Sequence, residues 1–287
     1  MVFQSRNDIE YAGHQDGHVT DICAGWIHAF PERCETLITP RTKAIVLITP
    51  NNPTGAVYSP STIIAFANLA RKHNIALIID ETYRDFILDG PPHPLFSSSP
   101  HPCLSTDWRW RSTFIHLFSF SKSYCIPGHR LGLICASPAF IPSINTALDN
   151  LQICAPRPPQ IALAPLLPSL RPFIRDTALS LVHRHTLFKS HLPPLWRIGS
   201  QGGYFAFVQH PFVGVHANDV CRRLAEERGV VCLPAGFFGP KTRNGGIPGE
   251  EDRDALLAKP GRSKLGYFSE TSISLGTPSS ERLFNGM

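Results

Sequence analysis

Three clusters of polar residues, each directly after an apolar run, hold the side chains that could do chemistry. They are Asn51–Gly55 (NNPTG), Asp80–Tyr83 (DETY) and Ser119–Lys122 (SFSK), with Arg130 following the third. In open α/β sheets, ligands bind beyond the carboxyl ends of the strands. We therefore expect the three clusters to line one pocket.

These clusters contain side chains of types that can react with or bind other groups. The amine of a lysine such as Lys122 forms a Schiff base with an aldehyde when it is partly neutral. Once released, such an amine can carry a proton as a general base or acid. An arginine such as Arg130 presents a planar charged fork that suits a dianion.

Alternating strand and helix patterns surround the clusters. The apolar runs 43–50 and 75–80 predict buried strands, and a helical pattern begins between them after Ser59. This unit is about the size of a right-handed βαβ crossover. Two more runs, 114–118 and 131–136, complete the strands. Because the runs are apolar throughout, we expect an α/β fold with a mostly parallel sheet sandwiched by helices.

The pattern changes after residue 155. Residues 169–192 carry the apolar stripe of a long helix. A strand, a helix and a second strand are then predicted at 203–208, 217–228 and 229–233, which indicates a smaller α+β unit. We expect three parts: a large domain at 1–168, a connecting helix at 169–192, and a small C-terminal domain at 193–287.

In this order and spacing, the three clusters resemble the class I/II aminotransferases, which are fold type I enzymes dependent on pyridoxal 5'-phosphate (PLP). Gly202–Phe207 (GGYFAF) and Leu233–Pro240 (LPAGFFGP) are similar to that family's small domain. Each motif alone is a weak signal, whereas the ordered set is strong. The resemblance covers residues 40–240 and implies PLP as the cofactor, bound to an N-terminally incomplete PLP-transferase large domain.

The resemblance assigns the central chemistry to two residues. Lys122 corresponds to the catalytic lysine that holds PLP as a Schiff base. Asp80 corresponds to the acid that pairs with the pyridine nitrogen and lets the ring act as an electron sink. From the residues alone, Lys122 could instead be a solvated surface lysine, and Asp80 could cap a helix that follows it.

Four further residues correspond to cofactor ligands of the family. Tyr83 and Asn52 match the groups that hydrogen-bond the ring hydroxyl, and Ser119 and Arg130 match ligands of the phosphate. Alternatives stay open for these residues as well. Asn52 could serve only the turn, Tyr83 could be an ordinary packing residue, and Arg130 could bind a helix end or a carboxylate of the core.

The implied function is transfer of an amino group between an amino acid and a 2-oxo acid, the two substrates that we expect as partners. Lyases and synthases of the same fold use the same cofactor ligands, so these activities stay open as alternatives. Family resemblance also implies a homodimer.

Two departures from the family pattern bear on activity. Family members carry a further N-terminal segment, with a glycine turn that holds the cofactor phosphate and an aromatic stacked on the ring. Residues 1–40 contain no substitute, so we expect an N-terminally truncated chain. Ser272 stands where the family has the arginine that binds the substrate carboxylate, and a serine cannot make that bidentate charged contact. A non-catalytic remnant is therefore a further alternative.

Composition argues against several other classes of protein. The net charge of +5 is spread without a Lys/Arg block, so no nucleic-acid partner is expected. Apolar runs are strand-sized, which argues against a membrane span, and the N-terminus lacks the apolar core of a secretion signal. The eight cysteines and thirteen histidines show no zinc-type spacing, so we expect no metal site and a cytoplasmic protein.

Overall fold

The computed structural model describes residues 2–4, 9–10, 29–90, 92–97, 101–238 and 270–274. These residues form two compact units. Unit 1 holds the described residues up to 51 and 57–182, and unit 2 holds 52–56 and the described residues from 183 onward. The division falls inside helix α8 (Arg171–His191). The domain boundaries expected from the sequence stay a prediction.

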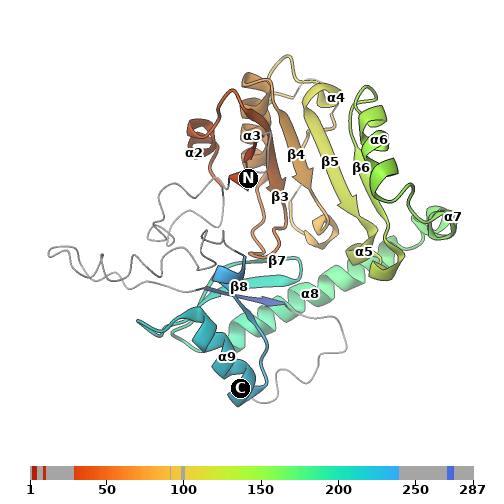
Figure 1. Cartoon of the computed structure of the whole chain (residues 1–287). Coiled ribbons are helices and arrows are strands. Elements are labelled where there is room, and N and C mark those ends of the chain that lie inside the picture. The colour runs from red at the N-terminus through yellow and green to blue at the C-terminus, as the bar shows by residue number, and fades with distance from the viewer. Residues whose placement is uncertain are drawn as a thin grey trace. The chain divides into compact units, whose positions relative to one another are not determined.

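Unit 1 is built on a six-stranded sheet in the order β2-β1-β3-β4-β5-β6 (Figure 1). Its strands are β1 (Val2–Gln4), β2 (Ile9–Glu10), β3 (Thr42–Ile48), β4 (Ala76–Asp80), β5 (Phe114–Ser119) and β6 (Gly132–Cys135). Neighbours β3, β4 and β5 run parallel, whereas β1, β2 and β6 pair antiparallel. Three of the four strands longer than three residues are thus parallel. The predicted α/β fold with a mostly parallel sheet is confirmed.

Helices connect and flank these strands. They are α2 (Pro31–Thr36), α3 (Pro60–Lys72), α4 (Trp110–Thr113), α5 (Phe120–Ser123), α6 (Ile141–Leu151), α7 (Arg157–Leu163) and the first half of α8, with short 3-10 turns η2 (Arg84–Phe86), η3 (Pro127–His129) and η4 (Ala164–Leu166). The predicted helix after Ser59 is α3. The Ser59 side chain accepts a hydrogen bond from the Thr62 N–H at 3.1 Å, which caps the helix start.

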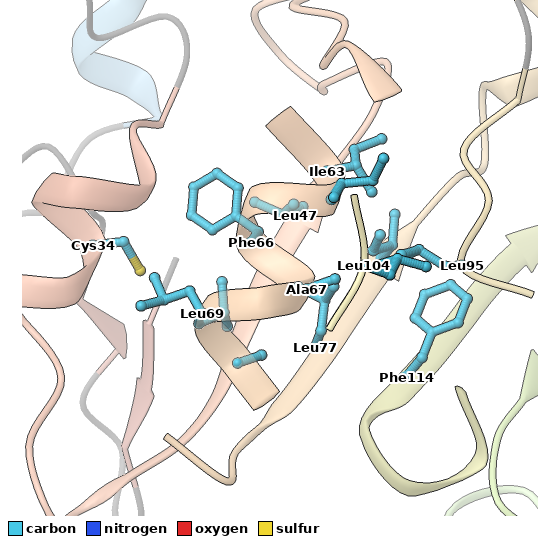
Figure 2. Packing of buried hydrophobic residues seen from close by; sticks show 14 of the residues in the cluster. Cys34, Leu47, Ile63, Phe66, Ala67, Leu69, Leu77, Leu95, Leu104 and Phe114 are labelled. Atoms are coloured by element: carbon cyan, nitrogen blue, oxygen red, sulfur yellow. The ribbon is translucent and has the colours of Figure 1, made fainter. Parts of the chain in front are cut away.

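The main core of unit 1 packs α3 against one face of the sheet (Figure 2). Alternate strand residues supply the sheet side of this core, and each is at most 2% exposed: Ile45, Leu47, Leu77, Ile79 and Phe114. The residues between them, such as Val46 and Ile78, are only half-buried. Because strand side chains alternate between faces, Asp80 lies on the half-buried face with Ile78.

Unit 2 contains a four-stranded antiparallel sheet in the order β7-β8-β10-β9. Its strands are β7 (Arg197–Gly202), β8 (Phe205–Gln209), β9 (Leu233–Pro234) and β10 (Glu270–Ser274). Helix α9 (Ala217–Arg228), the 3-10 turn η5 (Ala235–Phe237) and the second half of α8 accompany it. A smaller α+β unit was expected, and unit 2 has this composition.

One predicted strand of unit 2 is wrong over most of its length. Residues 230–232 belong to no strand, and β9 begins only at Leu233. Gly229 ends α9 in the left-handed conformation, with a φ of 67°. The next N–H, that of Val230, turns back to the Leu224 carbonyl at 3.0 Å. This stretch therefore closes the helix instead of extending into the sheet.

The NPTG turn packs inside unit 2. Gly55 has a φ of +73°, and a Cβ added to it would lie 2.7 Å from the Gly202 nitrogen and 2.8 Å from the Phe205 carbonyl oxygen. Ser200 donates its hydroxyl to the Thr54 carbonyl at 2.5 Å. Only glycine combines this backbone conformation with so close an approach of two other backbone segments.

Candidate active site

The candidate site begins where β4 and β5 end. Asp80 is the last residue of β4 and Ser119 the last of β5, and the parallel register sets Asp80 opposite Leu117. Leu117 and Ser119 are two residues apart and therefore share a face of β5. The two polar side chains thus stand on one face, at the carboxyl ends of neighbouring parallel strands.

The segment after β4 is a tight turn organised by Asp80. Its Oδ1 accepts hydrogen bonds from the backbone N–H of Thr82 at 2.9 Å and from the Thr82 hydroxyl at 2.7 Å. Tyr83 follows Thr82 in this turn and is 4% exposed. Burial, and then the negative charge of Asp80, raise the pKa of Tyr83 to about 12. The phenol is therefore protonated at neutral pH and can donate a hydrogen bond.

Lys122 lies on α5, directly beyond β5. Ser119 caps this short helix by accepting a hydrogen bond from the Ser121 N–H at 3.3 Å. The Lys122 amine lies 5.9 Å from the centroid of the Tyr83 ring, within the range of a cation–π contact. Lys122 is half-buried.

Arg130 ends η3 in the left-handed conformation, with a φ of 50°. It is exposed, and its Nη1 donates to the Pro127 carbonyl at 3.1 Å. Two residues later, Gly132 pairs with Ser119 across β5 and β6. Five of the six predicted site residues lie in unit 1: Asp80, Tyr83, Ser119, Lys122 and Arg130. The sixth, Asn52, belongs to unit 2.

A buried cluster next to Asp80 was not predicted from the sequence. Glu81 Oε2 lies 2.8 Å from His116 Nε2, 3.3 Å from His93 Nε2 and 3.2 Å from Arg84 Nη1. Burial would raise the pKa of Glu81, but the hydrogen bonds from the two histidines outweigh it and hold the pKa at about 2. One signal could have revealed the cluster, because strand alternation after Ile79 puts Glu81 on the core face, where a charge needs partners.

The side chains gathered in unit 1 fit PLP by their chemistry. The Lys122 amine can react with the cofactor aldehyde, and the Asp80 carboxylate can pair with the pyridine nitrogen. The protonated Tyr83 phenol can donate a hydrogen bond to the ring oxygen. The Ser119 hydroxyl and the Arg130 guanidinium suit the phosphate.

Ser272 lies in β10, where its backbone pairs with Phe207 of β8 and Leu233 of β9.

Comparison with known proteins agrees with this donor set. The family model for aminotransferase class I and II matches residues 25–245. The chain belongs to this family. The matched range contains all six predicted site residues and parts of both units. Members of the family depend on PLP, which is the cofactor that the donor set fits.

The class I and II relatives are longer than this chain. The aspartate aminotransferase of Sulfurisphaera tokodaii is 27% identical over 213 residues, which are 71% of this chain and 50% of the relative. The arginine–pyruvate transaminase of Pseudomonas aeruginosa is 31% identical and covers 73% of this chain and 52% of its own length. The chain therefore spans about half the length of the curated relatives it matches.

Solved structures of aminotransferases share the fold. The N-succinyldiaminopimelate aminotransferase of Mycobacterium tuberculosis superposes with a TM-score of 0.64 at 22% identity, over 85% of this chain and 57% of that one. An aspartate aminotransferase of Thermus thermophilus gives 0.62 at 22% identity, over 86% and 59%. These likenesses establish the fold type of the chain.

Two features are absent from the part of the chain that the structure describes. No helix in the described ranges is long and apolar enough to cross a membrane. No three histidine, cysteine or acidic side chains in the same ranges come together in a way that could hold a metal ion.

Proposed function

We propose that the chain is a PLP-dependent aminotransferase that moves an amino group from an amino acid to a 2-oxo acid. One observation carries this proposal: the Lys122 amine lies 5.9 Å from the centroid of the Tyr83 ring, beyond the carboxyl ends of two parallel strands, and the charge of Asp80 acts on the same phenol. Relatives named aspartate aminotransferase and arginine–pyruvate transaminase support the reaction type.

Each candidate site residue then has a defined role. PLP, when bound, supplies a ring that accepts electrons from the substrate carbon. Lys122 anchors the cofactor and afterwards carries the proton to and from that carbon. The Asp80 carboxylate keeps a proton on the ring nitrogen, and the protonated Tyr83 phenol donates to the ring oxygen.

Three more residues hold the cofactor in place in this proposal. Ser119 and Arg130 bind the phosphate, with Arg130 providing the charged fork. Asn52, in unit 2, is assigned to the ring oxygen by the family resemblance alone.

Purified chain loaded with PLP provides the test. A panel of amino donors with 2-oxoglutarate or pyruvate should give amino-group transfer, measured by the amino acid formed from the acceptor. Release of pyruvate and ammonia without an acceptor would instead identify a lyase of the same fold. No visible absorption band on addition of PLP would identify a remnant without cofactor chemistry.

We also propose a homodimer. Helices α6 and α7 contain no buried residue, and apolar side chains gather on β6 and on these helices, in a part of unit 1 that the structure describes. Leu151 and Ile153 are 80% and 77% exposed. Exposed apolar side chains on neighbouring elements are typical of protein–protein contacts.

The dimer proposal is tested by sedimentation. Replacing Leu151 and Ile153 together with glutamate should weaken self-association about 100-fold, because it introduces charge into an apolar contact. The matched control replaces Leu195 and Val213, which are 74% and 78% exposed in unit 2, with glutamate. A monomeric wild type, or equal association of both double variants, would contradict the proposal.

We propose a cytoplasmic location as well. The eight cysteines are scattered through the sequence without the pairing pattern of a disulfide-stabilised secreted protein.

A further inference from the structure

The buried carboxylate of Glu81 joins three segments of unit 1 behind the candidate site. Its Oε2 contacts His116 of β5 at 2.8 Å, His93 of the 92–97 segment at 3.3 Å, and Arg84 of η2 at 3.2 Å. The side chains of Glu81, His93 and His116 are 4%, 2% and 9% exposed. Rings of Phe96 and Phe114 surround the histidines.

The proton positions in this cluster follow from the partners. His93 Nδ1 accepts the Leu95 backbone N–H at 3.3 Å, so it carries no proton, and the proton of a neutral ring is on Nε2. His93 therefore donates to Glu81. A carboxylate can only accept, so His116 Nε2 also donates. Three donors thus converge on one oxygen that carries negative charge.

This arrangement controls the turn that carries Asp80 and Tyr83. The backbone N–H of Glu81 donates to Leu117 of β5 at 2.9 Å, and the Glu81 carbonyl accepts from the Arg84 N–H at 2.9 Å. The backbone carbonyl and the side chain of Glu81 both accept hydrogen bonds from Arg84. Tyr83 lies between these two residues, so two hydrogen bonds close the turn that contains it. Asp80 precedes Glu81 and faces the opposite side of the sheet.

The same cluster links this turn to the strand that carries Lys122. His116 lies on β5, which ends at Ser119 and continues directly into α5 with Lys122. The contact between Glu81 and His116 therefore fixes the end of β4 relative to the end of β5. The 5.9 Å separation between the Lys122 amine and the Tyr83 ring spans these two ends.

Fold stability alone gives a weak reason for a charge at this place. Removing a carboxylate from water is costly, and well-packed apolar residues often stabilise a core as well or better. A charged, fully hydrogen-bonded group instead fixes one geometry for the segments it joins. Such supporting groups are needed where a site tolerates little displacement.

We propose that Glu81 is a positioning residue of the PLP site, acting through His116, His93 and Arg84 to set where Asp80 and Tyr83 stand relative to Lys122. The proposal rests on the proposed PLP-dependent function.

Glu81→Gln is the main test, because it keeps the size of the side chain and removes its charge. With PLP bound, the pH midpoint of the visible band should rise by about 0.5–1 unit. A displaced Tyr83 and Asp80 stabilise the deprotonated form of the bound cofactor less well, so it loses its proton only at higher pH. The affinity for PLP should fall about tenfold. Glu35→Gln is the matched control, since Glu35 binds Lys72 at 2.6 Å and His73 at 3.0 Å in the same unit. It should leave both values unchanged.

A second variant covers the case in which Glu81→Gln does not fold. Arg84 is 35% exposed, so Arg84→Gln removes one partner at a small cost to folding. It should shift the midpoint in the same direction by a smaller amount. If both folded variants keep the wild-type midpoint and PLP affinity, the proposal is wrong. If Glu81→Gln does not fold, an Arg84→Gln variant that keeps the wild-type midpoint and PLP affinity also shows that the proposal is wrong.

A measurement on the cofactor-free chain separates this proposal from the proposed function. Tyr83 ionisation can be followed by ultraviolet titration and assigned by difference from Tyr83→Phe. In Glu81→Gln the pKa of Tyr83 should fall from about 12 toward the value of an ordinary tyrosine. A wild type without a visible band would refute PLP binding, and an unchanged Tyr83 titration would refute the positioning role.

Discussion

Lys122→Ala is expected to abolish the visible band that PLP gives with the wild-type chain and to lower amino-group transfer at least about 10³-fold. Alanine offers no amine for the cofactor aldehyde and no group that carries the proton. Absorption spectra of the PLP-loaded protein and an assay of amino-acid formation measure the two effects. Both losses should occur together, because one amine serves both tasks.

A matched variant and a chemical map define this experiment further. Lys43→Ala removes an exposed lysine from β3 of the same unit and should leave band and activity unchanged. Borohydride treatment of the wild type should bleach the band and leave the cofactor on the peptide that contains Lys122. A band that persists in Lys122→Ala, or an adduct on another peptide, would refute the assignment.

Gly55→Ala is expected to lower the free energy of unfolding by about 3 kcal/mol or more. The new Cβ would lie 2.7 Å from the Gly202 nitrogen and 2.8 Å from the Phe205 oxygen, and backbone atoms cannot turn aside as a side chain can. The positive φ of 73° adds about 1 kcal/mol of strain. Denaturant unfolding, followed by circular dichroism, measures the loss.

Gly214→Ala separates the two contributions. Gly214 also lies in unit 2 with a φ of +76°, but a Cβ there would meet nothing within 4 Å. Its cost should therefore be the strain alone, about 1 kcal/mol. Equal destabilisation by the two variants would mean that the close contact at Gly55 relaxes without cost.

The strands around the site were predictable from the sequence because each is a short apolar run with clear ends. The run at 75–80 stops at Asp80, and the strand that forms there, β4, ends at the same residue. The run at 114–118 likewise predicts β5 to within one residue at its end. Local polarity changes determine such boundaries, so they can be found without tertiary information.

Strand β7 could not be predicted in the same way. Its residues, RIGSQG, include two glycines and alternate poorly, so no local pattern distinguishes them from a loop. They become a strand because β8 pairs with them along Arg197–Gly202. Val230–Cys232 shows the opposite error, since a strongly β-forming sequence follows a glycine that ends a helix.

The candidate site shows the same division between local and distant information. Asp80, Ser119 and Lys122 could be found because each follows its strand directly. The partners of Glu81 could not, because His93 and His116 are 12 and 35 residues away along the chain. The contact with His116 depends on the register of β4 against β5, which no single segment of the sequence specifies.

The turn at residues 52–56 has a consequence for how this chain could be recombined. It belongs to unit 2, although residues on both sides of it belong to unit 1. Unit 2 is therefore discontinuous along the gene, and no single crossover point exchanges it whole. A chimera that took the chain after Val182 from a relative would pair a foreign β7–β8 hairpin with the resident Thr54 and Gly55. We therefore expect such a chimera to be more stable when the five-residue turn is exchanged along with it.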